Sequence, residues 1–157
     1  MSLQMSPDME RIFLRMQKED AHFANPMLVP LAQARADNAV ITSRWRHVDD
    51  GSLTIEHFAI PCLGRQMAAV RVARKEGGRA GTVLYLHGGG WVFGSVTSHL
   101  GAMARLASLS GLTVVGIDYG LAPESPFPGG LNDAAWAWRW LRAAQPTLSG
   151  PWLVSGD

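Results

Sequence analysis

Three consecutive glycines, Gly88 to Gly90, stand between His87 and Trp91, directly after an apolar run of residues. Each glycine loses more backbone entropy on folding than any other residue, so three together need a physical reason. Without Cβ atoms, their N–H groups can approach a ligand closely and point toward one spot. Two such donors form an oxyanion hole, and removing one donor costs about 3–4 kcal/mol of transition-state stabilisation. This segment could therefore stabilise a negatively charged oxygen during acyl transfer.

The same segment has a simpler interpretation as a flexible glycine turn, and the glycines alone would favour it. The histidine before them and the tryptophan after them, at the end of a predicted strand, favour the anion site instead. A phosphate-binding loop fits poorly, because the sequence contains neither G-x-x-x-x-G-K-[ST] nor G-x-G-x-x-G in this region.

Composition limits the class of protein. The chain has 157 residues, of which 47% are hydrophobic and 17% charged, as is typical of one globular domain. The net charge is +1 and no run of basic residues occurs, which argues against nucleic acid or an anionic membrane as the main partner. No apolar stretch is long enough to span a bilayer. A single cysteine, Cys62, excludes an intrachain disulfide and favours a reduced, cytoplasmic setting.

The hydrophobic periodicity predicts the elements that must position the glycines. Helices are predicted at about residues 7–18 and 31–36, then over a segment with Leu100, Met103, Leu106 and Ala107 on one face, and last at about residues 131–144. Strands are predicted at about residues 53–60, 65–73, 82–87, 112–118 and 151–157. Ser6 is the expected N-cap of the first helix, Thr97 or Ser98 that of the third, and Gly111 the expected C-terminal end of the third. The alternation of strands and helices in the second half predicts an α/β fold with a parallel sheet, and the earlier strand pair forms its edge.

Ligands of a parallel α/β sheet bind outside the carboxyl ends of its strands. The glycine segment follows the carboxyl end of the strand predicted at residues 82–87, so it lies where such a sheet places a site.

Three stretches in this order carry a family resemblance: "YLHGGGWVFGS", "DYGLAPESPFPGGLNDAAWAW" and "VSGD". The chain resembles the hormone-sensitive-lipase-like branch of the α/β-hydrolases over roughly residues 50–157. The resemblance implies an α/β-hydrolase fold, in which residues 1–45 form an N-terminal helical cap segment and residues 46–157 the N-terminal half of the catalytic domain. It also implies carboxylic-ester hydrolysis by a Ser-His-Asp triad, with neither cofactor nor metal.

The resemblance assigns roles within the glycine segment. Gly89 and Gly90 are the expected oxyanion donors, and Gly88 is the turn that joins them to His87. The imidazole of His87 is expected to support the loop rather than to act as a catalytic base, because a base must also meet a nucleophile.

Two acidic residues, Asp118 and Glu124, could be taken for a pair of acid–base carboxylates, but the resemblance implies that both stabilise the neighbouring loop. Gly120 stands where the family usually has arginine. A buried charged link is therefore missing or supplied elsewhere, and we expect a looser loop.

Other candidates receive simpler interpretations. Trp136, Trp138 and Trp140 could form a stacking platform, although helix packing is the safer expectation, with Trp136 and Trp140 on a shared face. The remaining histidines are expected to be surface or packing residues: His22, His47, His57 and His99.

The last two residues, Gly156 and Asp157, match the first two positions of the G-x-S-x-G nucleophile elbow. The serine would be the next residue, with the triad acid and histidine further on. A chain split at a modified serine, a cleavage before that serine and a plain truncation all remain open, and the first two are favoured. We expect residues 1–157 to pack against the C-terminal remainder of the domain, on the same polypeptide or a separate chain, because an apolar final strand needs a neighbour.

The sequence therefore predicts a serine carboxylesterase or lipase-like hydrolase that acts on small or short-acyl esters. The alternative is a non-catalytic, receptor-like relative that binds a small molecule, for which Gly120 is the one hint. A half-domain that acts as an interaction module is a third hypothesis, and a homodimer remains open.

Overall fold

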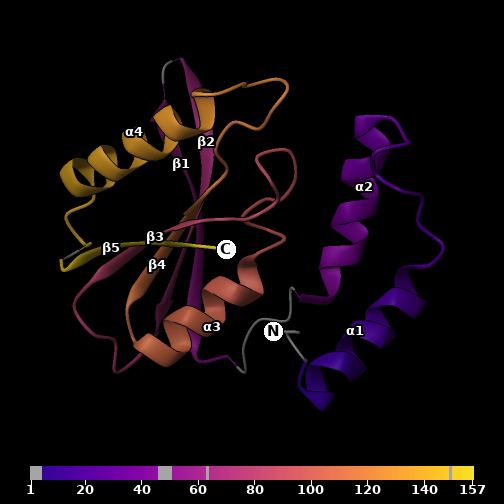
Figure 1. Cartoon of the computed structure of the whole chain (residues 1–157). Coiled ribbons are helices and arrows are strands. Elements are labelled where there is room, and N and C mark those ends of the chain that lie inside the picture. Colours follow the sequence, from indigo (N-terminus) through magenta and orange to yellow (C-terminus); the bar gives the residue numbers. More distant parts are fainter. Residues whose placement is uncertain (1–4, 46–50, 63, 149) are drawn as a thin grey trace. The chain divides into compact units, whose positions relative to one another are not determined.

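The computed structural model describes residues 5–45, 51–62, 64–148 and 150–157 (Figure 1). The chain divides into two compact units, Met1–Ile41 and Thr42–Asp157. Each unit is described by itself.

The first unit consists of two helices. Helix α1 (Pro7–Asp20) begins as predicted, with Pro7 in the first turn and the Ser6 hydroxyl accepting the N–H of Met9 at 3.3 Å. Helix α2 (Leu31–Thr42) extends beyond the predicted end at residue 36, because no glycine or proline follows there to stop it. Among the described residues of these two helices, only Ala34 is buried.

The second unit, after a short 3-10 turn (Ser43–Trp45), is built on a five-stranded mixed sheet in the order β1-β2-β4-β3-β5. Strands β1 (Leu53–Cys62) and β2 (Arg65–Arg74) form an antiparallel pair, and β2 pairs antiparallel with β4 (Thr113–Ile117). Strand β3 (Thr82–Leu86) runs parallel to β4 on one side and to β5 (Trp152–Gly156) on the other. The predicted parallel sheet with a strand pair at its edge is confirmed.

Helices cover both faces of this sheet (Figure 1). Helix α3 (Leu100–Ser110) packs against β2 and β4, whereas α4 (Gly129–Ala144) packs against β1. Neighbouring residues of β3 show the alternation of a buried strand, since Leu84 belongs to the cluster under α4 and Val83 to the cluster under α3. The core is therefore two apolar layers, one on each face.

The ends of α3 differ in part from the prediction. Gly111 closes the helix as predicted, with φ 75° and its N–H bonded to Ala107 O at 2.9 Å. The N-cap position belongs to His99, whose side chain makes no cap bond. The prediction of Thr97 or Ser98 as the cap was wrong, because the Ser98 hydroxyl is used inside the preceding loop, where it bonds the N–H of Ser95 at 2.9 Å.

Helix α4 begins at Gly129, two residues before the predicted start. Ala137 and Leu141 are fully buried, whereas Leu131, in the first turn, is 60% exposed.

The tryptophans of α4 serve helix packing, as predicted. Trp138 meets Trp152 edge to face, with ring centroids 5.8 Å apart, and Trp140 stacks on Phe58 of β1. The indole N–H of Trp136 donates to Pro61 O at 2.6 Å, so Trp136 and Trp140 both face β1.

Strand β5 forms one edge of the described sheet. Two of its apolar side chains, Leu153 and Val154, are 45% and 59% exposed. That a further strand covers them stays a prediction. Within the described ranges, no helix is both long enough and apolar enough to cross a membrane.

The two-layer core generates a stability prediction. Met103 of α3 is fully buried and Leu109 of the same helix is 78% exposed. We expect Met103→Ala to lower the free energy of unfolding by about 2–5 kcal/mol, because it leaves a cavity under the sheet. Leu109→Ala, the control, should change it by less than about 0.5 kcal/mol. Urea denaturation of both variants measures this, and equal effects would contradict the assigned core.

Candidate active site

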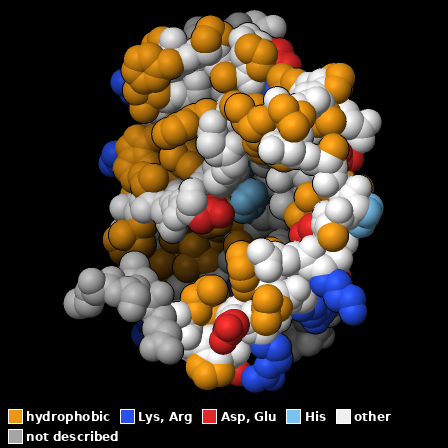
Figure 2. Space-filling model, turned by 45° about the vertical axis from the view of Figure 1, so that its right-hand side comes forward, with side chains coloured by type: hydrophobic (Ala, Val, Ile, Leu, Met, Phe, Trp, Pro, Cys, Tyr) orange, Lys and Arg blue, Asp and Glu red, His pale blue; other side chains and the backbone are white. Residues whose placement is uncertain are grey.

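The predicted site residues gather at the carboxyl ends of β3 and β5. A pocket of about 600 Å³ opens there, between the glycine segment, the loop after β4 and the start of α4. Its lining comprises Leu86, His87, Gly88, Gly90, Trp91, Tyr119, Gly130, Leu131, Ala134, Val154, Ser155, Gly156 and Asp157. In the space-filling view, an acidic and a histidine side chain lie next to each other at the surface, and hydrophobic side chains lie nearby (Figure 2). The pocket is mostly apolar with few polar groups, as in small-molecule sites.

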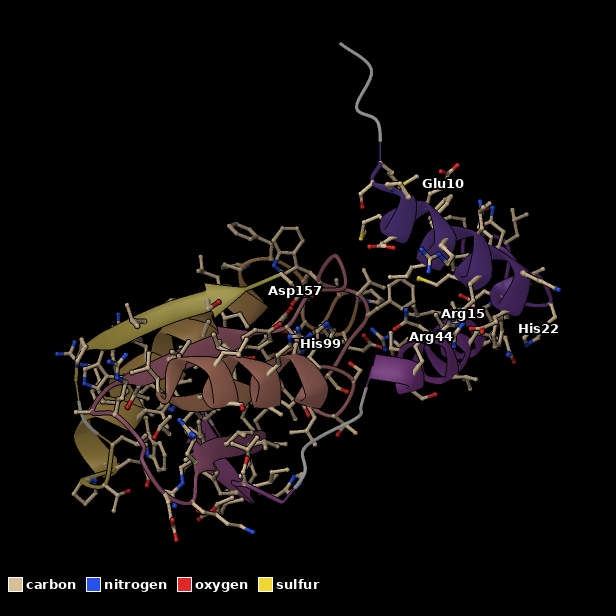
Figure 3. All side chains as sticks on the ribbon, turned by 90° about the horizontal axis from the view of Figure 1, so that it is seen from below. Glu10, Arg15, His22, Arg44, His99 and Asp157 are labelled. Carbon is tan, nitrogen blue, oxygen red and sulfur yellow. The ribbon has the colours of Figure 1, made fainter. Side chains whose placement is uncertain are left out.

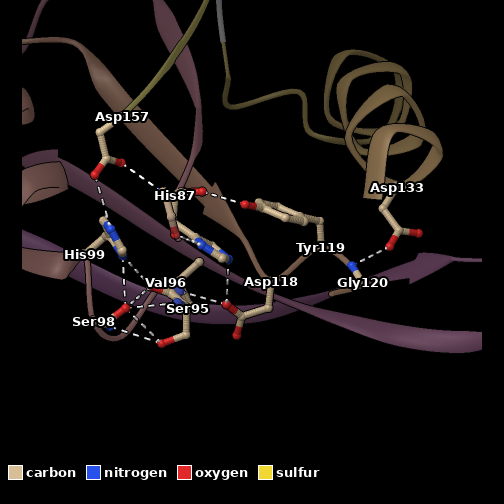
Figure 4. Close-up of polar contacts among 11 residues, drawn as sticks. His87, Ser95, Val96, Ser98, His99, Asp118, Tyr119, Gly120, Asp133 and Asp157 are labelled. Atoms are coloured by element: carbon tan, nitrogen blue, oxygen red, sulfur yellow. Dashed lines mark hydrogen bonds and ion pairs between the residues drawn. The ribbon is translucent and has the colours of Figure 1, made fainter. Parts of the chain in front are cut away.

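The carboxylate of Asp157 connects the end of β5 to the glycine segment (Figure 4). Its Oδ1 accepts the N–H of Gly88 and the hydroxyl of Tyr85, each at 2.9 Å. Its Oδ2 lies 3.3 Å from Nε2 of His99. Burial works against the charged form, but the hydrogen bonds from Tyr85, His99 and Gly88 outweigh it and lower the pKa of Asp157. Asp157 is therefore a stable anion that bridges two separate elements.

Gly156 allows the close approach of β5 to β3 that brings Asp157 there. A Cβ atom at Gly156 would lie 2.5 Å from Leu86 O, which is closer than atoms can pack. Gly156 and Asp157, which match the first two positions of the nucleophile elbow, thus both line the pocket.

The conformation of the glycine segment explains the need for glycine at its centre. Gly89 has φ 125°, a region that L side chains rarely adopt, and a Cβ atom there would collide with the carbonyl of Phe93. Its own carbonyl accepts the N–H groups of Val92 at 3.1 Å and Phe93 at 2.9 Å. Trp91, at φ 60°, keeps the same left-handed sense. The segment is therefore a tight, bonded loop and not a flexible turn.

The three glycine amides are not equivalent. Gly88 donates to Asp157, as described above. Within the part of the chain that the structure describes, the amides of Gly89 and Gly90 donate to no acceptor. The N–H of Gly88, which the sequence places in the turn before the two expected donors, thus has a carboxylate partner.

His87 lies beneath the segment, with only 3% of its surface exposed. Its ring stacks on Tyr119 with centroids 4.4 Å apart, and its Nδ1 lies 3.0 Å from Gly88 O. The Tyr119 hydroxyl donates to His87 O at 2.5 Å. Burial lowers the pKa of His87, even though Asp118 lies 3.9 Å from Nε2 and acts in the opposite direction. A neutral, stacked and bonded imidazole fits the predicted support of the loop.

The loop after β4 is stabilised by carboxylates, as predicted for Asp118. Asp118 Oδ1 accepts the N–H of Val96 at 2.7 Å, which ties this loop to the segment before α3. Asp133 Oδ2 accepts the N–H of Gly120 at 2.7 Å and pairs with Arg65 of β2. The charged link that Gly120 lacks is therefore supplied elsewhere, by Arg65.

A side chain at Gly120 would not fit this arrangement. Its Cβ would lie 2.5 Å from the Ser125 hydroxyl and 3.1 Å from Asp133 Oδ2. The neighbouring Cys62 thiol lies 3.4 Å from Asp133 Oδ1, and burial raises the pKa of that thiol. Gly120 thus belongs to a closely packed corner and is not a sign of a loosened loop.

The sequence did not single out four of the residues that build this site: Tyr85, His99, Arg65 and Asp133. Asp133 is an acidic residue among apolar residues of a predicted helix, and this unusual position is the one sequence feature that could have indicated its role. The others depend on contacts between residues far apart in the chain. Among the described residues, no three His, Cys, Asp or Glu side chains gather as metal ligands would.

Comparisons with known proteins agree with this geometry. Residues 83–157 match the family model described as alpha/beta hydrolase fold. An ethyl acetate hydrolase from Pseudomonas putida is 49% identical over 59 residues, which cover 38% of this chain and 19% of that protein. A hyperthermophilic esterase from the archaeon Pyrobaculum calidifontis superposes with a TM-score of 0.83 at 30% identity, over 99% of this chain and 50% of that one.

A crystal structure of an esterase from the bacterial hormone-sensitive lipase family superposes with a TM-score of 0.78 at 30% identity, over 99% of this chain and 48% of that one. The chain therefore spans about half the length of these solved relatives. Together the comparisons show that the chain has the α/β-hydrolase fold. It is similar to about half of an esterase of the bacterial hormone-sensitive lipase family.

The buried imidazole generates a pH prediction. Because the folded-state pKa of His87 is lowered, its contribution to stability is complete above the unfolded value of about 6.5 and is lost as the pH falls toward the folded value. We expect the free energy of unfolding to fall more between about pH 7 and pH 5 in the wild type than in His87→Gln. Urea denaturation at both pH values measures this, and equal slopes would contradict the neutral, buried histidine.

Proposed function

We propose that this chain forms part of a serine carboxylesterase that hydrolyses small or short-acyl esters. The N–H groups of Gly89 and Gly90 are the oxyanion donors, and the nucleophilic serine follows Asp157 in the sequence. The C-terminal remainder of the domain, which supplies the serine and the triad acid and base, is the partner against which residues 1–157 pack. The cytoplasmic setting and a homodimer stay predictions.

One observation carries the proposal. Two glycine amides, which have no acceptor among the described residues, lie in a loop whose third amide donates to the carboxylate of Asp157. Gly89 and Gly90 are both exposed, so their N–H groups are accessible to a ligand, and a preorganised pair of such donors is what acyl transfer requires. The similarity to proteins named as esterases supports the same reaction class.

The reaction follows from this geometry. The serine hydroxyl attacks the acyl carbon of the ester, and negative charge develops on the carbonyl oxygen. The amides of Gly89 and Gly90 stabilise that charge without reorganisation, because the Gly89 carbonyl is already fixed by Val92 and Phe93. When the tetrahedral intermediate collapses, the ester C–O bond breaks, and the alcohol leaves with the proton that the triad base took from the serine. Water then attacks the acyl-enzyme, which releases the carboxylic acid and regenerates the serine hydroxyl.

The pocket lining supports a small apolar acyl group. The side chains of Trp91, Leu131, Ala134 and Val154 line the pocket. Among its described lining residues, three have ionisable side chains: His87, Tyr119 and Asp157. All three already contact the glycine segment or the histidine before it: Asp157 accepts the Gly88 N–H, His87 Nδ1 lies 3.0 Å from Gly88 O, and the Tyr119 hydroxyl donates to His87 O. The name of the Pseudomonas putida relative, ethyl acetate hydrolase, agrees with a short acyl group.

Hydrolysis of p-nitrophenyl esters by the full natural polypeptide is the direct test. We expect turnover of the acetate and butyrate, and a lower kcat/KM for the dodecanoate. A folded protein without activity on any of these esters would contradict the proposal and favour the receptor-like alternative.

A substitution in the glycine segment tests the oxyanion donors. Gly89→Val should lower kcat by at least about 100-fold, because the branched Cβ collides with the Phe93 carbonyl and turns the amides away from the pocket. Gly77→Val is the matched control, since Gly77 also has positive φ, at 66°, but its Cβ would meet no atom within 4 Å. Steady-state kinetics on the acetate compares them. A Gly89→Val enzyme with near-normal kcat would overturn the assignment.

A further inference from the structure

His99 lies directly before α3 and reaches two separate parts of the site (Figures 3 and 4). Its Nδ1 lies 2.9 Å from the Ser98 hydroxyl and 3.2 Å from Ser95 O, both in the loop that precedes the helix. Its Nε2 lies 3.3 Å from Asp157 Oδ2, at the end of β5. The imidazole thus connects the start of α3 with the carboxylate that binds the glycine segment.

The direction of these hydrogen bonds follows from the groups involved. A carboxylate can only accept, so Nε2 must carry a proton to bond Asp157. The Ser98 hydroxyl donates to Ser95 O at 2.9 Å and can turn to donate to an unprotonated Nδ1 instead, whereas Ser98 Oγ and Ser95 O can both accept from a protonated Nδ1. Both the neutral Nε2–H tautomer and the imidazolium therefore donate to Asp157, and the contact does not depend on one protonation state.

The carboxylate of Asp157 divides its two oxygens between different partners. Oδ2 faces His99, and Oδ1 accepts the Gly88 N–H and the Tyr85 hydroxyl. The Asp157 side chain is 55% exposed, so water competes for both oxygens. A donor on Oδ2 fixes the plane of the carboxylate and so keeps Oδ1 directed at Gly88 N. His99 is only 16% exposed, which makes it a rigid donor.

We propose that His99 is a positioning residue for the oxyanion loop: through Asp157 it fixes the Gly88 amide, and thereby the orientation of the Gly89 and Gly90 amides. The kinetic consequence of this inference rests on the proposed esterase function. The contact between His99 and Asp157 is independent of that function. The sequence placed His99 among surface and packing residues, and the structure instead links it to the catalytic loop.

A merely structural role has a different signature. His99 occupies the N-cap position of α3, where asparagine is among the best residues. Asparagine can also mimic Nδ1 and keep the contacts to Ser95 and Ser98, but it is too short to reach Asp157. Glutamine is a poorer cap, yet its amide N–H₂ extends to the position of Nε2. The two variants therefore separate capping from positioning.

The experiment compares His99→Asn and His99→Gln in the full natural polypeptide, with His57→Gln as control, since His57 is exposed on β1. Two quantities are measured: kcat and KM on p-nitrophenyl acetate, and hydrogen exchange of the Gly88 amide in ¹⁵N-glycine-labelled protein. We expect His99→Asn to lower kcat about tenfold with KM within about twofold, because the lost alignment matters where charge develops in the transition state.

The exchange readout should follow the same order. Gly88 should exchange about tenfold faster in His99→Asn than in the wild type, whereas His99→Gln and His57→Gln stay within about threefold in both quantities. Equal behaviour of His99→Asn and His99→Gln, or a better His99→Asn, would overturn the proposal. If His99→Asn fails to fold, His99→Gln decides, since a loss beyond about threefold in it contradicts the proposal.

Failure of the proposed function is distinguishable from failure of this inference. If the wild type hydrolyses no ester, the proposed function fails, and the exchange of Gly88 still decides. Faster exchange in His99→Asn alone then supports the contact path from His99 to Gly88, and unchanged exchange overturns it.

Discussion

The hydrogen bond from the Gly88 amide to the carboxylate of Asp157 is the interaction on which the site depends. It joins the end of β5 to the loop after β3, two segments far apart in sequence. Because the acceptor is charged, such a bond is worth about 1.5–3 kcal/mol, more than a bond between neutral groups. It also withdraws one of three glycine amides from the pocket and leaves the other two in a fixed frame.

The remaining contacts limit how that frame can move. Beneath it, His87 is buried and stacked on Tyr119, whose hydroxyl returns to the His87 carbonyl. Beside it, Asp118 bonds Val96 and thereby ties the loop after β4 to the segment before α3. The positive φ of Gly89 is accessible to glycine without strain, and these neighbours hold the loop in that conformation. Preorganisation here is a product of packing and carboxylate bonds on several sides.

The sequence predicted most of the fold because its signals are local. Alternating and helical spacing located the strands and α-helices of the described residues, although not the 3-10 turn at Ser43–Trp45, and Gly111 ended α3 as expected. The prediction of the α3 cap failed because the Ser98 hydroxyl accepts the N–H of Ser95 within the preceding loop instead of capping the helix. In the site, the order of motifs identified the glycines and Asp157. The roles of Tyr85, His99 and Arg65 could not be predicted, because each depends on a partner many residues away.

The central claim is that Gly88 is held by Asp157 while Gly89 and Gly90 face the reacting oxygen. The most direct test is a crystal structure of the full natural polypeptide after reaction with a p-nitrophenyl phosphonate ester, whose phosphoryl oxygen stands in for the oxyanion. The account predicts that oxygen at about 2.7–3.1 Å from both the Gly89 and the Gly90 nitrogen, with Gly88 N still bonded to Asp157 Oδ1. A phosphoryl oxygen bound by other donors, or a Gly88 amide turned away from Asp157 toward it, would contradict the account.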